Sequence, residues 1–196
     1  MASYSFNGFI PVVHPAAFVH QTAVLIGDVI VNEDCYIGPG AVIRGDWGRI
    51  TLEPGCNVQE NCVVHMFPGI HIVFERGAHV GHGAVIHGAH LKKNCLIGMN
   101  AVVMDGAVVG ENSIVGALSF VKSEEIIPDN HLFAGNPGKI IRALGDEQIA
   151  WKTSGTALYQ SLPKECHATL LPVEPLIEME SNRPSHTLRY RPWKKT

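Results

Sequence analysis

Aliphatic residues recur at every sixth position over most of this chain, and this period constrains the fold more than any other feature. The period holds at the start of the chain, is interrupted after residue 43 and again after residue 64, and returns toward residue 121. The aliphatic positions are Val19, Leu25, Val31, Ile37, Ile43, Leu52, Val58, Val64, Val80, Ile86, Leu91, Ile97, Val103, Val109, Val115 and Val121.

A six-residue period excludes an amphipathic α-helix, whose apolar face returns after three and four residues. It favours a β-solenoid, in which each unit supplies one short strand and one turn, and three units close a triangular coil. The aliphatic residue and a small residue four positions later then point into the prism. The small residues are Ala23, Cys35, Ala41, Cys56, Cys62, Ala84, Cys95, Ala101, Ala107, Ser113 and Ser119.

Four of the five cysteines occupy these small-residue positions, and no CxxC pair occurs. We therefore expect buried fillers rather than reactive thiols, a disulfide framework or a zinc ribbon.

The sequence divides into three parts. Residues 1–122 carry the repeat and predict the solenoid domain. Residues 123–171 predict a connecting segment and a C-terminal helix: FAGNPGKIIRAL places turn residues before an apolar helical pattern, and the helix runs from Asp146 to Leu162 along the outside of the prism. Residues 172–196 lose all periodicity, and the ending NRPSHTLRYRPWKKT predicts a mobile arm.

The overall composition excludes several classes of protein. The net charge of −3 gives no basic excess for nucleic acid. No stretch approaches the roughly 20 apolar residues of a membrane span, and the opening residues lack the pattern of a signal peptide. A cytoplasmic location is the expectation that follows.

Two histidines occupy equivalent positions of the repeat. His65 directly follows Val64, and His87 directly follows Ile86. The segment between them is longer than a regular coil of 18 residues by a loop of four, which brings the two histidines into register. At the strand spacing of about 4.8 Å, both imidazoles can reach one metal ion. His82 leaves the coil in another direction, so we expect a neighbouring subunit to present it.

Three neutral imidazoles with one open position are typical of a catalytic zinc site. We therefore predict Zn²⁺, with cobalt, iron or nickel as alternatives that three imidazoles also accept. The competing interpretation makes each histidine a solvated corner residue. We keep that ordinary role for the other histidines, which are His14, His20, His71, His79, His90, His131, His167 and His186.

The stretches IRGDWGRI, NVQENCVVH and VGHGAVIHG resemble the γ-class carbonic anhydrase family of hexapeptide-repeat proteins. The resemblance implies an all-β fold, a left-handed parallel β-helix with a C-terminal α-helix packed alongside. It also implies a homotrimer with each metal held between subunits by His65, His82 and His87.

The same resemblance implies roles for other residues. Arg44 and Asp46 would form interface contacts near the metal, although an ordinary ion pair is the alternative. Asn57 and Gln59 would hydrogen-bond the water or substrate at the metal. Tyr159 in the helix would lean toward the site.

A narrower resemblance covers nearly the whole chain, in GFIPVVHPAAFVH, AVLIGDVIV, GMNAVVMDGAVVGENSIVGA and IAWKTSGTALYQ. These stretches are similar to the members of the family that act in phenylacetate degradation and in the carnitine operon. That likeness implies a metal-dependent thioesterase for aryl-acyl-CoA, in particular hydroxylated phenylacetyl-CoA, which would lie in the groove between subunits. Lys139 and Arg142 are candidate contacts for the CoA phosphates, with plain solvated basic residues as the alternative.

The chain departs from the family pattern at two places. Trp47 stands where the anhydrases carry Glu, and MFPGIHIVF replaces an acidic loop. Without these carboxylates fast CO2 hydration is not expected, and a Trp and a Phe beside the metal suit an apolar acyl group. Trp47 also occupies an inward position of the repeat, where packing would explain it. Three rival functions remain: carbonic anhydrase, acyl transfer from acyl-CoA, and a non-enzymatic accessory role in a CoA-dependent pathway.

Overall fold

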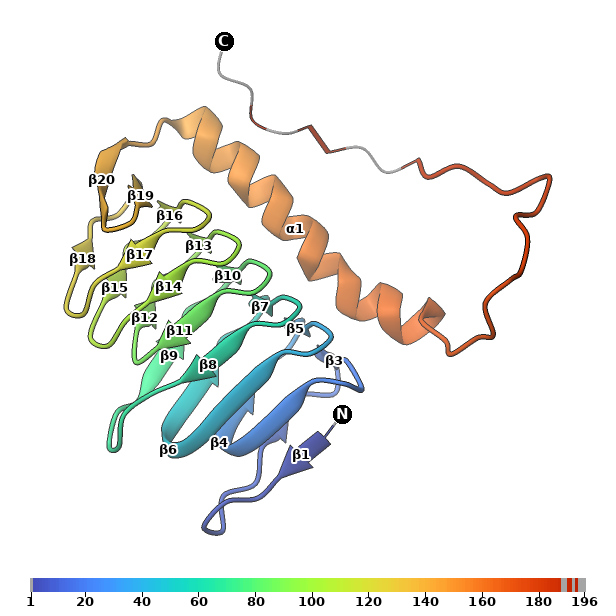
Figure 1. The fold of residues 1–196 in the computed structure, drawn as a ribbon, viewed down its shortest axis with the longest axis horizontal. Helices are drawn as coiled ribbons and strands as arrows, with labels where there is room; N and C mark the ends of the chain where they lie inside the picture. The colour runs from blue at the N-terminus through green and yellow to red at the C-terminus, as the bar shows by residue number, and fades with distance from the viewer. Residues whose placement is uncertain (1, 188–189, 192, 194–196) are drawn as a thin grey trace.

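Short parallel strands, stacked coil upon coil, form a β-solenoid of about seven turns with one long helix along its side (Figure 1). The structure is a computed structural model that describes residues 2–187, 190, 191 and 193. The solenoid confirms the fold class that the six-residue period predicts. In Figure 1 the coils run in sequence order from β3 and β4 at one end to β18 and β19 at the other.

Two faces of the prism join into one sheet because β4 (Val24–Val31) and β6 (Val42–Leu52) continue around the corner between them. The pairing of these two strands shifts register between Gly27 and Val29, at the corner. The other strands of this sheet are β1 (Ala2–Tyr4), β2 (Val12–Val13), β8 (Val63–His65), β9 (Ile72–Phe74), β11 (Val85–His87), β12 (His90–Leu91), β14 (Val102–Val103), β15 (Val108–Val109), β17 (Phe120–Val121) and β18 (Ile126–Ile127).

The third face is a separate sheet, and the helix packs against it. All its pairings are parallel except the last one, between β19 and β20. Its strands are β3 (Phe18–Val19), β5 (Tyr36–Ile37), β7 (Asn57–Val58), β10 (His79–Val80), β13 (Leu96–Ile97), β16 (Ile114–Val115), β19 (His131–Gly135) and β20 (Gly138–Ala143).

The core consists of aliphatic side chains stacked in register inside the prism. One column contains six fully buried residues, each paired with the next on the adjacent coil: Leu25, Ile43, Val64, Ile86, Val103 and Val121. Cys35, Cys56, Cys62 and Cys95 are buried and unbridged, as predicted. The thiols of Cys35, Cys56 and Cys62 donate to backbone carbonyls, for example Cys62 Sγ to Gly81 O at 3.1 Å. The inward positions therefore hold only small or apolar side chains.

The C-terminal helix α1 (Asp146–Thr169) is longer than predicted. It passes through Gly155 and Pro163 instead of ending at Leu162. Its last turns stay helical because they pack on the solenoid: Pro163 is buried, and His167 Nε2 lies 3.0 Å from Ala17 O. Proline removes only one helical hydrogen bond, which this packing offsets.

The prediction of a helical pattern after residue 137 is wrong. Residues Gly138–Ala143 form β20, an antiparallel hairpin partner of β19. Gly135, with φ of 109°, helps to make the tight reversal. The backbone of β20 then pairs with the exposed edge of the last coil. Pairing the free N–H and C=O groups of this edge outweighs the local preference for a helix. The parallel pairing itself continues past residue 122, through β18 and β19.

The described residues after Leu170 contain no helix or strand. Part of this segment returns to α1: Trp151 Nε1 donates to Arg191 O at 2.8 Å, and Tyr190 Oη donates to Trp151 O at 3.0 Å. The predicted mobile arm also covers residues 188, 189, 192 and 194–196, which lie outside the described residues. Among the described residues, no helix is long and apolar enough to cross a membrane.

Candidate metal centre

His65 and His87 lie side by side on adjacent coils. They end strands β8 and β11, and the strand register pairs them directly, as the loop of four residues predicts. Nδ1 of His65 lies 3.3 Å from Nε2 of His87, and their ring centroids are 5.2 Å apart. The repeat thus brings two imidazole nitrogens face to face at the edge of the prism.

Each of these two rings uses its other nitrogen on a carboxylate. Nε2 of His65 lies 3.0 Å from Asp46 Oδ1, and Nδ1 of His87 lies 2.8 Å from Asp105 Oδ1. A neutral imidazole has one N–H, and here that hydrogen is donated to the carboxylate. Burial lowers the pKa of His65, which favours its neutral form. The two nitrogens that face each other therefore both carry lone pairs.

Arg44 and Asp46 belong to the same cluster within one chain. Arg44 Nη1 donates to Asp46 Oδ2 at 3.0 Å, and Arg44 Nη2 lies 3.3 Å from His65 Nδ1. Asp46 therefore bridges Arg44 and His65 and holds the imidazole ring in place. The ion pair between Arg44 and Asp46 that was the alternative forms within one chain, and the expected contact between subunits near a metal stays a prediction.

Two exposed aromatic rings flank the histidine pair. Trp47 lies 5.0 Å from His65 and Phe67 lies 5.0 Å from His87, measured between ring centroids. Trp47 is 45% exposed, so the interpretation of Trp47 as an inward packing residue is wrong. The physical reason is that three extra residues between Ile43 and Leu52 interrupt the repeat, and Trp47 lies on the corner that they form.

His82 lies at another corner of the prism and pairs with Glu60. Its Nδ1 contacts Glu60 Oε2, while Tyr36 Oη donates to Glu60 Oε1 at 2.9 Å. Burial would raise the pKa of Glu60, but hydrogen bonds from its own backbone, Tyr36 and His82 outweigh this and keep it below the usual value. His82 is thus the third imidazole whose one ring nitrogen is engaged by a carboxylate.

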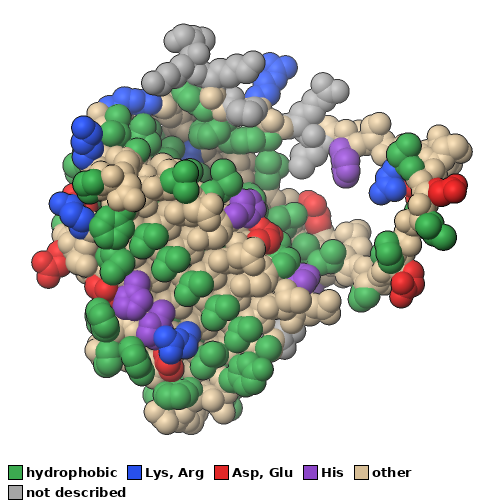
Figure 2. Space-filling view, in the orientation of Figure 1, with side chains coloured by type: hydrophobic (Ala, Val, Ile, Leu, Met, Phe, Trp, Pro, Cys, Tyr) green, Lys and Arg blue, Asp and Glu red, His purple; other side chains and the backbone are tan. Residues whose placement is uncertain are grey.

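Within the described ranges of the chain, no three His, Cys, Asp or Glu side chains are grouped to hold a metal ion. The geometry therefore unites His65 with His87 and leaves His82 in a separate cluster. Figure 2 shows purple histidine side chains lying against blue and red ones, among green hydrophobic side chains and tan backbone and other groups.

Sequence reasoning missed Glu60 and Asp105, although the repeat contains a signal for both. Glu60 precedes His82 by 22 residues, which is the separation of His65 and His87 across the same long coil. Asp105 follows His87 by 18 residues, one regular coil. A carboxylate one coil away from a histidine in the same column is therefore a usable sequence pattern.

Asn57, Gln59 and Tyr159 belong to a third cluster, together with His79. Gln59 Nε2 lies 3.0 Å from Asn57 Oδ1 and 2.6 Å from His79 Nε2, and the Tyr159 ring meets the His79 ring edge-on at 4.9 Å. From the sequence alone His79 has only an ordinary role, because a single histidine has no distinctive spacing. Gln59, His79 and His82 line one groove of about 330 Å³ beside β13 and β16.

Lys139 and Arg142 lie on the exposed strand β20 at one end of the solenoid (Figure 1). Arg142 Nη1 donates to Gln148 Oε1 at 2.6 Å, at the start of α1. This contact accounts for Arg142 without a ligand, and a role in CoA binding stays a prediction for both residues.

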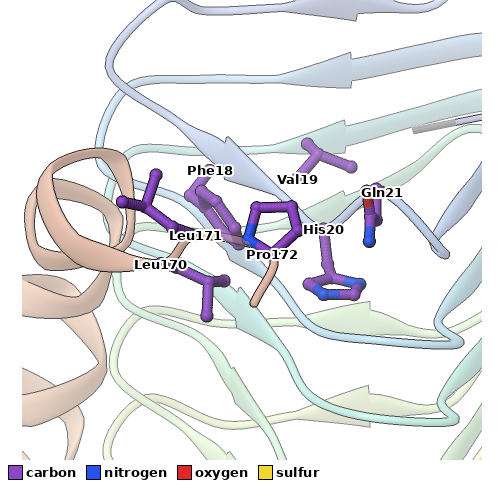
Figure 3. Close-up of a pocket in the computed structure, with 7 residues that line it drawn as sticks. All are labelled: Phe18, Val19, His20, Gln21, Leu170, Leu171 and Pro172. Carbon is purple, nitrogen blue, oxygen red and sulfur yellow. The ribbon is translucent and has the colours of Figure 1, made fainter. Parts of the chain in front are cut away.

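The other end of the solenoid contains a cavity of about 360 Å³ between β3 and the end of α1. Figure 3 shows that its walls are mainly apolar, with His20 and Gln21 at one side. The His20 ring is engaged locally, with Nδ1 2.9 Å from Thr22 Oγ1. This cavity gathers no group of reactive side chains; its lining residues are Phe18, Val19, His20, Gln21, Leu170, Leu171 and Pro172.

A parallel solenoid with six-residue repeats, a C-terminal helix and histidines at its corners defines the class of hexapeptide-repeat proteins. Comparison with known families agrees, since residues 88–123 match the bacterial transferase hexapeptide (six repeats) family. Carnitine operon protein CaiE of Escherichia coli O7:K1 is 47% identical over 94% of both chains, and CaiE of Shigella flexneri matches equally well. The chain belongs to the hexapeptide-repeat transferase family, in which CaiE is a close relative.

Solved structures support the same placement. A predicted acetyltransferase of Bacillus cereus superposes with a TM-score of 0.83 at 32% identity, over 85% of this chain and 97% of that one. A hexapeptide transferase family protein of Anaplasma phagocytophilum gives a TM-score of 0.80 at 32% identity, over 84% and 97% of the two chains. The chain is thus similar along most of its length to proteins described as transferases.

Proposed function

We propose that this protein is a metal-dependent hydrolase of acyl-CoA thioesters, with its metal held between subunits by His65, His87 and the His82 of a second copy. The observation that carries the proposal is the pair of facing nitrogens on His65 and His87. Two lone pairs 3.3 Å apart repel each other, and Arg44 Nη2, 3.3 Å from His65 Nδ1, can donate to only one of them. A divalent ion satisfies both at once.

The spacing of the two nitrogens fits this ion. Two ligands of a tetrahedral zinc at about 2.05 Å, with an angle near 109°, are separated by about 3.3 Å. Nδ1 of His65 and Nε2 of His87 have this separation. Carboxylates on the opposite nitrogens are the usual partners of metal-binding imidazoles, because they fix the ring and its tautomer. Asp46 and Asp105 occupy these places.

His82 also has one ring nitrogen engaged by a carboxylate. Glu60 engages its Nδ1, which leaves Nε2 with a lone pair on a ring that is 46% exposed. An exposed imidazole with a fixed tautomer suits a contact with another subunit. A cyclic trimer would repeat this contact three times, so that each interface gains one complete ligand set.

When bound, the ion would act as a Lewis acid that makes water more acidic and polarises a carbonyl oxygen. The residues of the chain supply the remaining functions. Gln59 and Asn57, next to His82, hydrogen-bond the attacking water or the substrate. Trp47 and Phe67 form an apolar wall beside His65 and His87. Hydrolysis consumes water, breaks the C–S bond, and releases a carboxylic acid and the CoA thiol.

The substrate class rests on two supports. The narrow resemblance in the sequence implies aryl-acyl-CoA, and exposed aromatic rings beside the histidine pair suit an apolar acyl group. The curated relatives are named for the carnitine operon, whose name does not state a reaction. We therefore assign acyl-CoA as the substrate class and phenylacetyl-CoA as the first member to test.

Acyl transfer is the second candidate function. It is favoured by the structural relatives from Bacillus cereus and Anaplasma phagocytophilum, which are described as a predicted acetyltransferase and a transferase-family protein. Transfer and hydrolysis differ in one measurable way. A transferase releases CoA only when an acceptor amine or hydroxyl is added, whereas a thioesterase needs water alone.

The test combines elemental analysis with CoA release from phenylacetyl-CoA and acetyl-CoA. We expect about one metal per chain in the wild type, with metal and CoA release both lost in His82→Ala. His90→Ala is the matched control, because His90 also pairs with a carboxylate, Glu75 at 2.8 Å, yet lies outside the three clusters. It should keep both properties.

The other outcomes are equally informative. A wild type without metal overturns the proposed site. Metal without CoA release from any thioester rejects the thioesterase. Acceptor-dependent release then points to acyl transfer, CO2 hydration abolished by a chelator points to a carbonic anhydrase, and neither activity points to an accessory role.

A further inference from the structure

A buried chain of polar groups connects helix α1 to Gln59. His79 Nδ1 lies 3.3 Å from Thr156 Oγ1, and Thr156 Oγ1 in turn donates to Lys152 O at 3.4 Å. On its other side, His79 Nε2 lies 2.6 Å from Gln59 Nε2. Exposure is only 8% for His79 and 2% for both Gln59 and Thr156, so water does not replace these contacts.

The hydrogen bond that Thr156 donates to Lys152 O selects one assignment of donors and acceptors among these side chains. The Thr156 hydroxyl hydrogen is used on Lys152 O, so Thr156 Oγ1 accepts from His79 Nδ1–H. His79 Nε2 then has no hydrogen and accepts from the Gln59 amide. Burial, together with the positive charge of Lys152, lowers the pKa of His79 to about 3, so the ring stays neutral.

The same assignment fixes the amides of Gln59 and Asn57. Gln59 Nε2 gives one hydrogen to His79 and the other to Asn57 Oδ1, at 3.0 Å. Gln59 Oε1 is left as an acceptor, on a residue that lines the groove shared with His82. Asn57 Nδ2 is left as a buried donor and has no partner among the described residues. A flip of one amide alone would bring two NH₂ groups, or two lone pairs, into contact, and a flip of both would require the opposite tautomer of His79.

We propose that His79 is the positioning residue that holds Gln59 with its carbonyl oxygen available, in the groove shared with His82, to the substrate or attacking water. The proposal rests on the proposed function, because it concerns the site that His82 completes. The direction of these hydrogen bonds is determined from α1. Thr156 fixes the tautomer of His79, and His79 fixes the orientation of the Gln59 amide. Tyr159, edge-on to His79, closes the other side of the ring.

This arrangement gives the helix a role beyond packing. An amide that can flip presents an acceptor half of the time and a donor half of the time, whereas this one presents a fixed acceptor. Fixed dipoles need no reorganisation when the reaction proceeds. The helix therefore selects one hydrogen-bonding pattern for the groove next to His82.

The first test is direct and does not depend on activity. Nitrogen-15 spectra of histidine-labelled protein as purified, assigned with His79→Gln, report which ring nitrogen carries the hydrogen. We expect His79 to show the Nδ1–H tautomer, unchanged from about pH 5 to about pH 8. The Gln59 side-chain amide hydrogens should exchange slowly with water. An Nε2–H tautomer, or fast exchange at Gln59, overturns the proposal.

The second test is a double-mutant cycle on CoA release. His79→Leu should lower kcat about ten- to hundredfold with little change in KM, because it frees Gln59 to turn. His79→Gln supplies a carbonyl acceptor at the same place and should recover most of this loss. In Gln59→Met, which has no amide to orient, His79→Leu should have no further effect on kcat.

The cycle separates positioning from stability. If His79→Leu acts only through the fold, its effect on kcat will be the same in both backgrounds, and the proposal is rejected. If the wild type releases no CoA at all, the proposed function fails. The tautomer and exchange measurements then decide by themselves whether His79 orients Gln59.

Discussion

The shared metal site makes a quantitative prediction about mixed assemblies. His65 and His87 face each other within one chain, while His82 lies in a different cluster of that chain. A His65→Ala chain can therefore still give His82 to a neighbour, and a His82→Ala chain can still give the histidine pair. Each variant alone should bind no metal, but the two together can rebuild complete sites.

The expected recovery follows from the geometry. In an equal mixture, half of the histidine pairs are intact and half of the neighbouring His82 rings are intact, so about one quarter of the sites are complete. Co-expression of the two variants should restore about a quarter of the wild-type metal content and CoA release. Elemental analysis and the thioesterase assay on the purified mixture measure both values.

A matched control separates this effect from chance assembly. His65 and His87 lie on the same chain in this arrangement, so co-expressed His65→Ala and His87→Ala should restore nothing. Recovery in this control pair, or no recovery in the His65 and His82 pair, would refute a site divided between subunits in this way. Three ligands on one chain predict no recovery in either mixture.

Three further predictions concern the wall, the backbone and pH. Trp47→Ala should raise the KM for phenylacetyl-CoA about tenfold and leave the KM for acetyl-CoA nearly unchanged, since it removes an aromatic surface. An equal effect on both substrates would contradict a contact between Trp47 and the acyl group. A Cβ at Gly48 would lie 1.8 Å from Ile70 O, whereas a Cβ at Gly145 would meet nothing within 4 Å. Gly48→Ala should therefore cost about 1–3 kcal/mol in urea unfolding, and Gly145→Ala less than about 0.5 kcal/mol. Because the pKa of His79 falls from an ordinary 6.5 to about 3 on folding, only the unfolded chain takes up this proton between those values. The free energy of unfolding is therefore unaffected by protonation of His79 above about pH 6.5, and below it falls by up to about 1.4 kcal/mol per pH unit. His79→Gln should flatten this slope of unfolding free energy against pH. An identical slope in the variant would contradict a buried neutral ring.

The repeat was sufficient to predict the solenoid because every six-residue unit specifies the same short strand and turn. Each unit places one aliphatic and one small residue inward, and errors at single positions average out over the run. The same logic predicted that His65 and His87 stack, because strand register follows from counting residues between equivalent positions. Both inferences depend on periodicity, which is a property of the chain alone.

Predictions failed where the repeat stops. Residues 138–143 have a helical pattern but form a strand, because the last coil offers an unpaired edge. Trp47 occupies an inward position by counting, yet it lies on a corner lengthened by extra residues. Helix α1 continues past Pro163 because the solenoid surface packs against it. In each case a contact with a distant part of the chain outweighed the local pattern.

The sequence by itself therefore determined the coil, its core and the position of the histidine pair. Only the tertiary structure decided how the polar groups around them are engaged. The carboxylates on His65, His82 and His87 come from other coils, and the orientation of Gln59 depends on a helix far along the chain. The physical reason is that inward packing repeats with the chain, whereas a hydrogen bond depends on where one atom of one side chain lies in space.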